Sequence, residues 1–215
     1  MRELFSLDRE TLGEACGIFA GDGSIYQSGK SHVLEVRTSR KEIYYYTHSV
    51  KPVFEEIFSR KLKIIRRSYQ GGYVIGLRAC GPEPMRLFGV FLEFPVGRKS
   101  HNLRMPKIIF NNMEYWKPYV RGVFDTRGSV YLRKTGKRKS GTYQNPVIEI
   151  SSRSIGHLIQ LKEILHETGF DFWLEKGNYK IRMAGKKNAE RFFKEIKPHN
   201  NTKTERFARI MRTNK

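Results

Sequence analysis

Two ten-residue segments carry the side chains with the clearest potential for chemistry. Residues 17–26 read GIFAGDGSIY and residues 122–131 read GVFDTRGSVY, so glycine, phenylalanine, serine and tyrosine recur at matching positions. The position before the second glycine holds Asp22 in the first copy and Arg127 in the second. A carboxylate at this point could bind a hard divalent cation, whereas a guanidinium can only donate hydrogen bonds and pair with an anion.

The two copies stand at the same point of a longer repeating order of elements. Apolar residues at helical spacing begin each copy, in residues 12–21 and 116–125, and alternating residues that predict a strand follow. The rest of each half contains the signals for a strand, a helix, a β-hairpin and a closing helix, and residues 203–212 predict one more helix. We therefore predict a duplicated α+β chain in which each half has the order α-β-β-α-β-β-α.

The composition of the chain suggests where the halves are divided. We place the first half at residues 1–95, a linker at 96–115 and the second half at 116–215, because Gly97 and Pro106 interrupt the pattern between the repeats. Residues 133–146, RKTGKRKSGTYQNP, predict a long basic loop between two strands and the most mobile part of the chain.

Small residues on the two repeated helices predict how the halves meet. Gly17 and Gly21 are four residues apart, as are Gly122 and Thr126, so each helix carries small residues on one face. Such faces allow two helix backbones to approach closely. If the helices pack through them, the residues at positions 22 and 127 become neighbours at the seam between the halves.

The charge of the chain points to a polyanionic partner. Lys and Arg number 41 against 21 Asp and Glu, which gives a net charge of +20 and a pI near 10.1. A folded chain this basic most often binds nucleic acid, and no apolar run approaches the length of a membrane span. Cys16 and Cys80 form no metal-binding or disulfide pattern. The charged N-terminus lacks a signal-peptide pattern, so we expect an intracellular, cytoplasmic protein with access to chromosomal DNA.

The repeated segments resemble the motifs of a known family. ACGIFAGDG at 15–23 and VRGVFDTRG at 120–128 are similar to the two motifs of LAGLIDADG homing endonucleases, specifically the single-chain type encoded in archaeal introns. The order of the elements also matches, so the resemblance covers nearly the whole chain. It implies a pseudo-two-fold saddle of two four-stranded antiparallel sheets that straddles a long, nearly palindromic site in double-stranded DNA, with the motif helices at the interface.

The resemblance also implies an activity and a cofactor. The family members are DNA endonucleases that hydrolyse phosphodiesters with Mg²⁺ or another divalent cation, and a single-chain member is expected to act as a monomer. A bound cation lowers the pKa of its water and neutralises charge as the bond breaks. By resemblance, Asp22 is a metal ligand, with the carbonyls of Gly21 and Thr126 as helpers. The family places a basic residue near each active site, and Lys41 (or the adjacent Arg40) and Arg153 stand at these points.

Arg127 departs from the family pattern, because it stands where the second acid is expected. It cannot ligate Mg²⁺, but it could contact Asp22 or a scissile phosphate. Asp125 is no easy substitute, because it lies on another helix face, and we expect it to accept hydrogen bonds at the helix end.

Three interpretations follow from this departure. The protein binds DNA without cutting it, or nicks one strand with Asp22 alone, or serves another role such as assisting intron RNA folding. We favour an endonuclease scaffold with strongly reduced cleavage. The alternative is a non-catalytic DNA- or RNA-binding protein, such as an intron splicing helper.

Strand alternation selects the side chains that would face DNA. Arginine suits guanine edges and glutamate can accept from cytosine, whereas basic loop residues suit phosphates. In the first half these are Ser24, Tyr26, Ser28, Glu35, Arg37, Arg66 or Arg67, and Arg78. In the second half they are Tyr131, Arg133, Glu149, Ser151, Lys180 and Arg182 on strands, and Lys134, Lys137, Arg138 and Lys139 in the basic loop.

Overall fold

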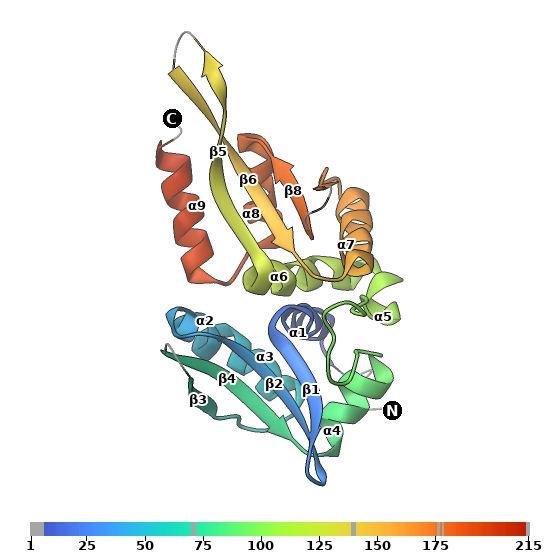
Figure 1. The fold of residues 1–215 in the computed structure, drawn as a ribbon. Coiled ribbons are helices and arrows are strands. Elements are labelled where there is room, and N and C mark those ends of the chain that lie inside the picture. The colour runs from blue at the N-terminus through green and yellow to red at the C-terminus, as the bar shows by residue number, and fades with distance from the viewer. Residues whose placement is uncertain (1–6, 70–71, 139–140, 176, 178, 214–215) are drawn as a thin grey trace.

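The computed structural model describes residues 7–69, 72–138, 141–175, 177 and 179–213. It has the predicted α+β class, with two halves and one four-stranded antiparallel sheet in each (Figure 1). No helix among the described residues is long and apolar enough to cross a membrane.

The first half follows the predicted order of elements. It begins with α1 (Arg9–Asp22) and the hairpin of β1 (Gly23–Ser28) and β2 (Ser31–Ser39). A helical segment follows, made of η2 (Arg40–Glu42), α2 (Ile43–Tyr45), η3 (Tyr46–Val50) and α3 (Lys51–Ile57). The half ends with the hairpin of β3 (Ile64–Tyr69) and β4 (Gly72–Cys80) and a third helical segment, made of α4 (Pro82–Pro84) and η4 (Met85–Phe91). The strand order in the sheet is β1-β2-β4-β3.

The second half repeats this order and adds a helix. Its elements are α6 (Trp116–Arg127), β5 (Gly128–Arg138), β6 (Gly141–Ser151), α7 (Ile155–Glu167), β7 (Trp173–Leu174), β8 (Lys180–Ala184), α8 (Lys186–Ile196) and α9 (Asn201–Thr213). The strand order is β5-β6-β8-β7, the same as in the first sheet. The last helix, α9, lies alongside β5 (Figure 1).

The segment at 96–115 is ordered rather than extended. It contains the short helix α5 (Lys107–Phe110) and a 3₁₀ turn, η5 (Met113–Tyr115). Leu103, Met105 and Ile109 are buried in the hydrophobic core. This part of the chain therefore contributes to packing between the halves.

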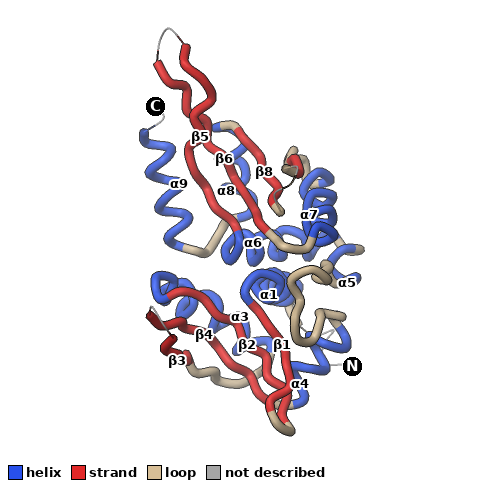
Figure 2. The backbone as a smooth tube through the Cα atoms, viewed as in Figure 1, coloured by secondary structure: helices blue, strands red, loops and turns tan. Residues whose placement is uncertain are grey.

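The motif helices α1 and α6 lie side by side at the centre of the molecule, with one sheet on either side (Figure 2). Their contact requires the predicted glycines. A Cβ atom at Gly17 would lie 2.1 Å from the carbonyl oxygen of Tyr119, and one at Gly122 would lie 2.4 Å from that of Glu14. Any larger residue at these points would collide with backbone, which cannot move aside as a side chain can.

Each motif helix ends at the residue that the repeat predicts. The α1 helix ends at Asp22 and α6 at Arg127, and the following glycines, Gly23 and Gly128, are extended. At each of these glycines a Cβ would meet the ring of the preceding Phe19 or Phe124 at 2.3 or 2.1 Å. The chain therefore passes directly from helix into strand, and side chains at the helix ends are held near the seam.

The basic segment 133–146 differs from our expectation of a loop. Strand β5 continues to Arg138 and β6 begins at Gly141, with a register shift between Lys134 and Lys137. The prediction of a long loop was wrong because polar residues can pair as a two-stranded ribbon without burying an apolar face. Lys139 lies outside the described residues.

Candidate functional site

Asp22 and Arg127 face each other at the seam between the halves. An Nη2 atom of Arg127 lies 3.3 Å from Oδ1 of Asp22, and the Tyr46 hydroxyl donates a hydrogen bond of 3.0 Å to Oδ2. The Asp22 side chain is 10 % exposed and that of Arg127 51 %. Burial raises the pKa of Asp22 to about 6, although the charge of Arg127 and the Tyr46 hydrogen bond oppose this rise. Asp22 is therefore ionised at neutral pH and paired with Arg127.

Arg127 also donates hydrogen bonds to the Gly21 carbonyl, which we expected to help hold a metal. Its Nε and Nη2 atoms donate hydrogen bonds of 3.1 and 2.9 Å to the carbonyl oxygen of Gly21. The Thr126 hydroxyl donates to carbonyls of its own helix, those of Gly122 and Val123. These residues do not fit a divalent cation in this arrangement, because the carboxylate and the carbonyl that would bind the cation are both bound to the Arg127 guanidinium.

Two lysines that the sequence analysis missed cap the motif helices. Lys99 Nζ donates to the carbonyls of Phe19 and Ala20, and Lys203 Nζ donates to those of Phe124 and Asp125. Lys99 follows Phe19 by 80 positions and Lys203 follows Phe124 by 79, and this nearly equal offset is the signal that could have revealed the pair. Both cations neutralise the negative end of a helix dipole.

Burial changes the acidity of both lysines. It lowers the pKa of Lys99 to about 7, with the charge of Arg127 adding to the effect, and that of Lys203 to about 8. Three basic side chains, those of Arg127, Lys99 and Lys203, therefore lie within electrostatic reach of the Asp22 carboxylate, as does the carboxylate of Glu42. The Arg127 guanidinium in particular favours an anion over a cation beside it.

A pocket of about 660 Å³ opens beside the seam on the side of the second half. Its basic lining includes Lys99, Arg127 and Lys180, and the predicted Arg153 also borders it and is exposed. Lys41 is exposed in η2 at the end of β2, and the neighbouring Arg40 lies over the ring of Tyr73. Of the two predicted strand-end residues, Arg153 is thus the one that lines the pocket.

The predicted face of the first sheet carries a cluster of tyrosine, glutamate and arginine. The Tyr26 hydroxyl donates to Oε2 of Glu35 at 2.9 Å and accepts from Nη2 of Arg78 at 3.0 Å. Arg37 and Arg67 lie 3.6 and 3.5 Å from the Glu35 carboxylate. We call this surface of the first sheet, and the matching surface of the second sheet, the polar faces.

The second sheet repeats the cluster at matching positions. The Tyr131 hydroxyl donates to Oε2 of Glu149 at 3.0 Å, and Arg182 Nε donates to the same oxygen at 2.7 Å. Lys180 Nζ lies 3.0 Å from Oε1 of Glu149. Glu35 pairs in register with Arg78, and Glu149 with Arg182, so the two clusters are related by the internal repeat.

The glutamates are more buried than strand alternation suggests. The Glu35 side chain is fully covered and that of Glu149 is 11 % exposed. We expected both to read bases directly, but in this structure they hold the surrounding basic side chains in place. Alternation correctly predicts the face of a side chain but not whether longer neighbours cover it.

Arg66 and Arg67 were left as alternatives by the sequence, and the register separates them. Arg67 pairs with Glu35 on the polar face. Arg66 lies opposite Ile75, which is buried in the core, so it belongs to the other face of the sheet. Arg66 is therefore removed from the predicted DNA-facing set.

The remaining predicted residues have simpler surroundings. Ser24 donates to the Glu35 carbonyl at 3.4 Å and Ser151 to the Arg127 carbonyl at 3.3 Å. Ser28 is exposed at the end of β1, and Arg133 is exposed along β5. The backbones of Lys134, Lys137 and Arg138 belong to β5.

Comparison with known proteins identifies the family. A family model described as the WhiA LAGLIDADG-like domain matches residues 14–75 and 116–215. The chain therefore belongs to the WhiA LAGLIDADG-like domain family, and it is a two-motif LAGLIDADG protein. Comparison with curated protein sequences gives no match.

Solved structures share the fold at low sequence identity. The LAGLIDADG homing endonuclease I-LtrWI bound to target DNA matches with a TM-score of 0.60 and 13 % identity, over 96 % of this chain and 92 % of that chain. A structure of mesophilic variants of the homing endonuclease I-DmoI gives 0.58 and 14 %, over 87 % and 95 %. The I-DmoI complex with DNA and Mn gives 0.58 and 15 %, over 87 % and 96 %.

Proposed function

We propose that the chain is a monomeric, intracellular protein that binds a long stretch of double-stranded DNA along both polar faces. In this form it hydrolyses that DNA weakly or not at all. The observation that carries the proposal is the position of Arg127, whose guanidinium holds the Asp22 carboxylate and the Gly21 carbonyl together. Mg²⁺-dependent cleavage needs these same two groups free.

Binding to duplex DNA is supported by charge and by symmetry. The net charge of +20 favours a polyanion through release of its counterions. The Glu35 and Glu149 clusters repeat at the same register positions in both sheets. A duplicated reading surface suits a site whose two halves are similar, as in a nearly palindromic sequence.

The basic groups of the polar faces divide into two kinds of contact. Arg37 and Arg67 are held by a glutamate yet 44 % and 43 % exposed, so each can present donors to a base edge in a fixed direction. The solvent-exposed Arg133 is suited to a phosphate. Arg127 and Arg153 beside the pocket would contact the DNA backbone at the centre of the site, where their charge stabilises bound phosphate without a metal.

The proposal is tested by selecting bound sequences from a library of random duplexes and measuring affinity for the selected site. We expect tight binding and a steep loss of affinity as salt rises from about 50 to 200 mM. We also expect a specificity ratio, the affinity for the selected duplex divided by that for random duplex, well above one. RNA of the same sequence, single-stranded and paired, serves as the comparison. Preference for RNA would overturn the duplex-DNA proposal and favour the role in intron RNA folding. Light scattering of the complex tests the monomeric state.

A further inference from the structure

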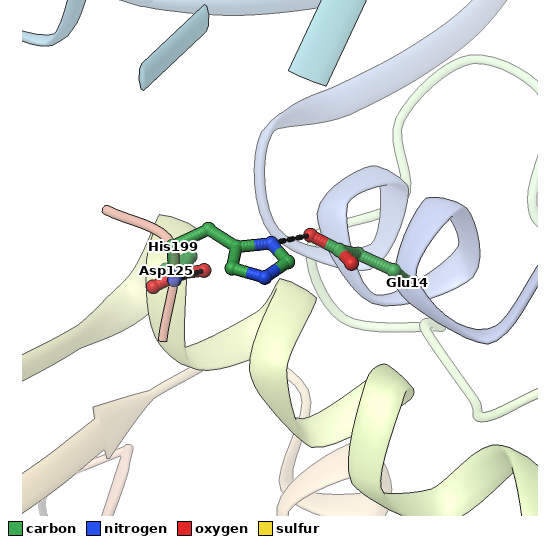
Figure 3. Close-up of side chains that lie close together, drawn as sticks. All are labelled: Glu14, Asp125 and His199. Atoms are coloured by element: carbon green, nitrogen blue, oxygen red, sulfur yellow. Dashed lines mark hydrogen bonds and ion pairs between the residues drawn. The ribbon is translucent and has the colours of Figure 1, made fainter. Parts of the chain in front are cut away.

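Three potential metal ligands from distant segments meet beside the motif helices (Figure 3). They are Glu14 on α1, Asp125 near the end of α6, and His199 between α8 and α9. One ligand atom from each lies within 4.8 Å of the others. Nδ1 of His199 is 2.8 Å from Oε1 of Glu14, and both acids are buried.

Neighbouring groups hold these ligands in fixed orientations. Arg121 donates from Nη1 to Oε2 of Glu14 at 3.2 Å, which leaves Oε1 directed at the imidazole. The backbone N–H groups of His199 and Asn200 donate to the two oxygens of Asp125 at 2.8 and 3.1 Å. The charge of Arg121 is shared with Glu10, at 2.6 Å. In metal sites, the side chains that bind the ion are typically oriented by hydrogen bonds from neighbouring residues.

The hydroxyl of Tyr45 gives independent evidence that a partner belongs here. Tyr45 is 1 % exposed, and its hydroxyl has no hydrogen-bond partner within the described part of the chain. Burial, followed by the charges of Asp125 and then Glu14, raises the pKa of Tyr45 well above its usual value. The hydroxyl thus stays protonated within electrostatic reach of both carboxylates, and leaving such a buried group without a partner costs free energy.

We propose that Glu14, Asp125 and His199 bind one divalent transition-metal ion of the Zn²⁺ class. An imidazole nitrogen with two carboxylate oxygens suits Zn²⁺ or Co²⁺ and disfavours Mg²⁺, which prefers an all-oxygen shell. A water molecule would complete the four-coordinate shell. The ion would join α1, α6 and the segment leading into α9, so its role is to hold the two halves together.

The test uses the whole protein, treated with a chelator and then titrated with Zn²⁺ or Co²⁺ alone. We expect one ion per chain, a visible Co²⁺ absorption band whose intensity reports four-coordinate binding, and no competition from excess Mg²⁺. At a Zn²⁺ concentration about a hundredfold above Kd, Tm should rise by about 5–10 °C. Glu163→Gln on the exposed side of α7 is the matched control, since it removes a carboxylate outside this cluster and should leave Zn²⁺ binding unchanged.

His199→Ala is the decisive variant. The His199 side chain is 43 % exposed, so its removal leaves the core intact, and circular dichroism with Tm in chelator verifies the fold. We expect this variant to lose the Co²⁺ band and at least 90 % of its Zn²⁺ affinity. The proposal is overturned if the wild-type protein binds no Zn²⁺, or if His199→Ala binds Zn²⁺ as tightly as the wild type.

Discussion

Arg127 donates two hydrogen bonds to the carbonyl of Gly21 and lies 3.3 Å from the carboxylate of Asp22, so one guanidinium joins the ends of both motif helices. In a symmetric arrangement, two acids at this seam would repel each other unless cations lay between them. Replacing one acid by arginine supplies the positive charge from within the chain. The carboxylate at the seam is then paired without a metal ion.

Adjacent arginines on β3 provide a direct test of which face binds DNA. Arg67→Ala should weaken binding to the selected duplex by about 1–3 kcal/mol, because it removes a donor held on the polar face by Glu35. Arg66→Ala removes the same charge from the opposite face and should change affinity little. Gel-shift titrations at one fixed salt concentration make the comparison. Equal losses in the two variants would show that only net charge matters.

Glu149→Gln should raise affinity for random duplex DNA and lower the specificity ratio. The substitution removes a negative charge from the polar face and frees Lys180 and Arg182 from the ion pairs that orient them. Competition between selected and random duplexes measures both quantities. Glu163→Gln on the exposed side of α7 is the charge-matched control. An unchanged specificity ratio in Glu149→Gln would contradict an orienting role.

Gly17→Ala should destabilise the protein by about 1–3 kcal/mol or more, because the added methyl group would meet the Tyr119 carbonyl at 2.1 Å. Gly89→Ala in η4 is the comparison, since its methyl group would press on the flexible Met85 side chain and make an ordinary contact with Val96. Urea unfolding gives the difference in the free energy of unfolding. Similar values for both variants would argue against a tight seam between α1 and α6.

His157 should make stability depend on pH. It is buried, its Nε2 lies 2.7 Å from the Tyr119 hydroxyl, and burial lowers its pKa to about 3 from 6.5. Between these values the unfolded chain binds more protons than the folded one, so the free energy of unfolding falls as the pH drops below about 6.5. Urea unfolding at several pH values should show a shallower decline for His157→Gln. Parallel declines would mean that His157 does not titrate as described.

The fold could be predicted from the sequence because the repeat fixed the order of elements and the glycines fixed their meeting point. Gly17 and Gly122 can be recognised at once, since only a residue without a side chain allows such an approach. Residues 133–146 were mispredicted because their polar composition is typical of loops, and strand pairing depends on the partner strand rather than on composition.

The site was only partly predictable. Strand alternation placed Tyr26, Glu35 and Arg78 on one face, but the full burial of Glu35 depends on how long side chains from neighbouring strands fold over it. Lys99 and Lys203 lie far from the motifs in sequence and reach them only through the tertiary fold. Their near-equal offsets from the motifs can be noticed once the duplication is known.

The most direct measurement incubates a supercoiled plasmid carrying the selected site with the wild-type protein, Arg127→Glu and Arg127→Ala, in Mg²⁺ and in Mn²⁺. We predict that the wild type binds the plasmid and leaves it largely supercoiled, and that Arg127→Glu yields open-circle or linear product at least tenfold faster. Arg127→Ala separates removal of the guanidinium from addition of a carboxylate. Rapid linearisation by the wild type, or no gain of cleavage in Arg127→Glu, would contradict the assignment of Arg127 as the group that blocks hydrolysis.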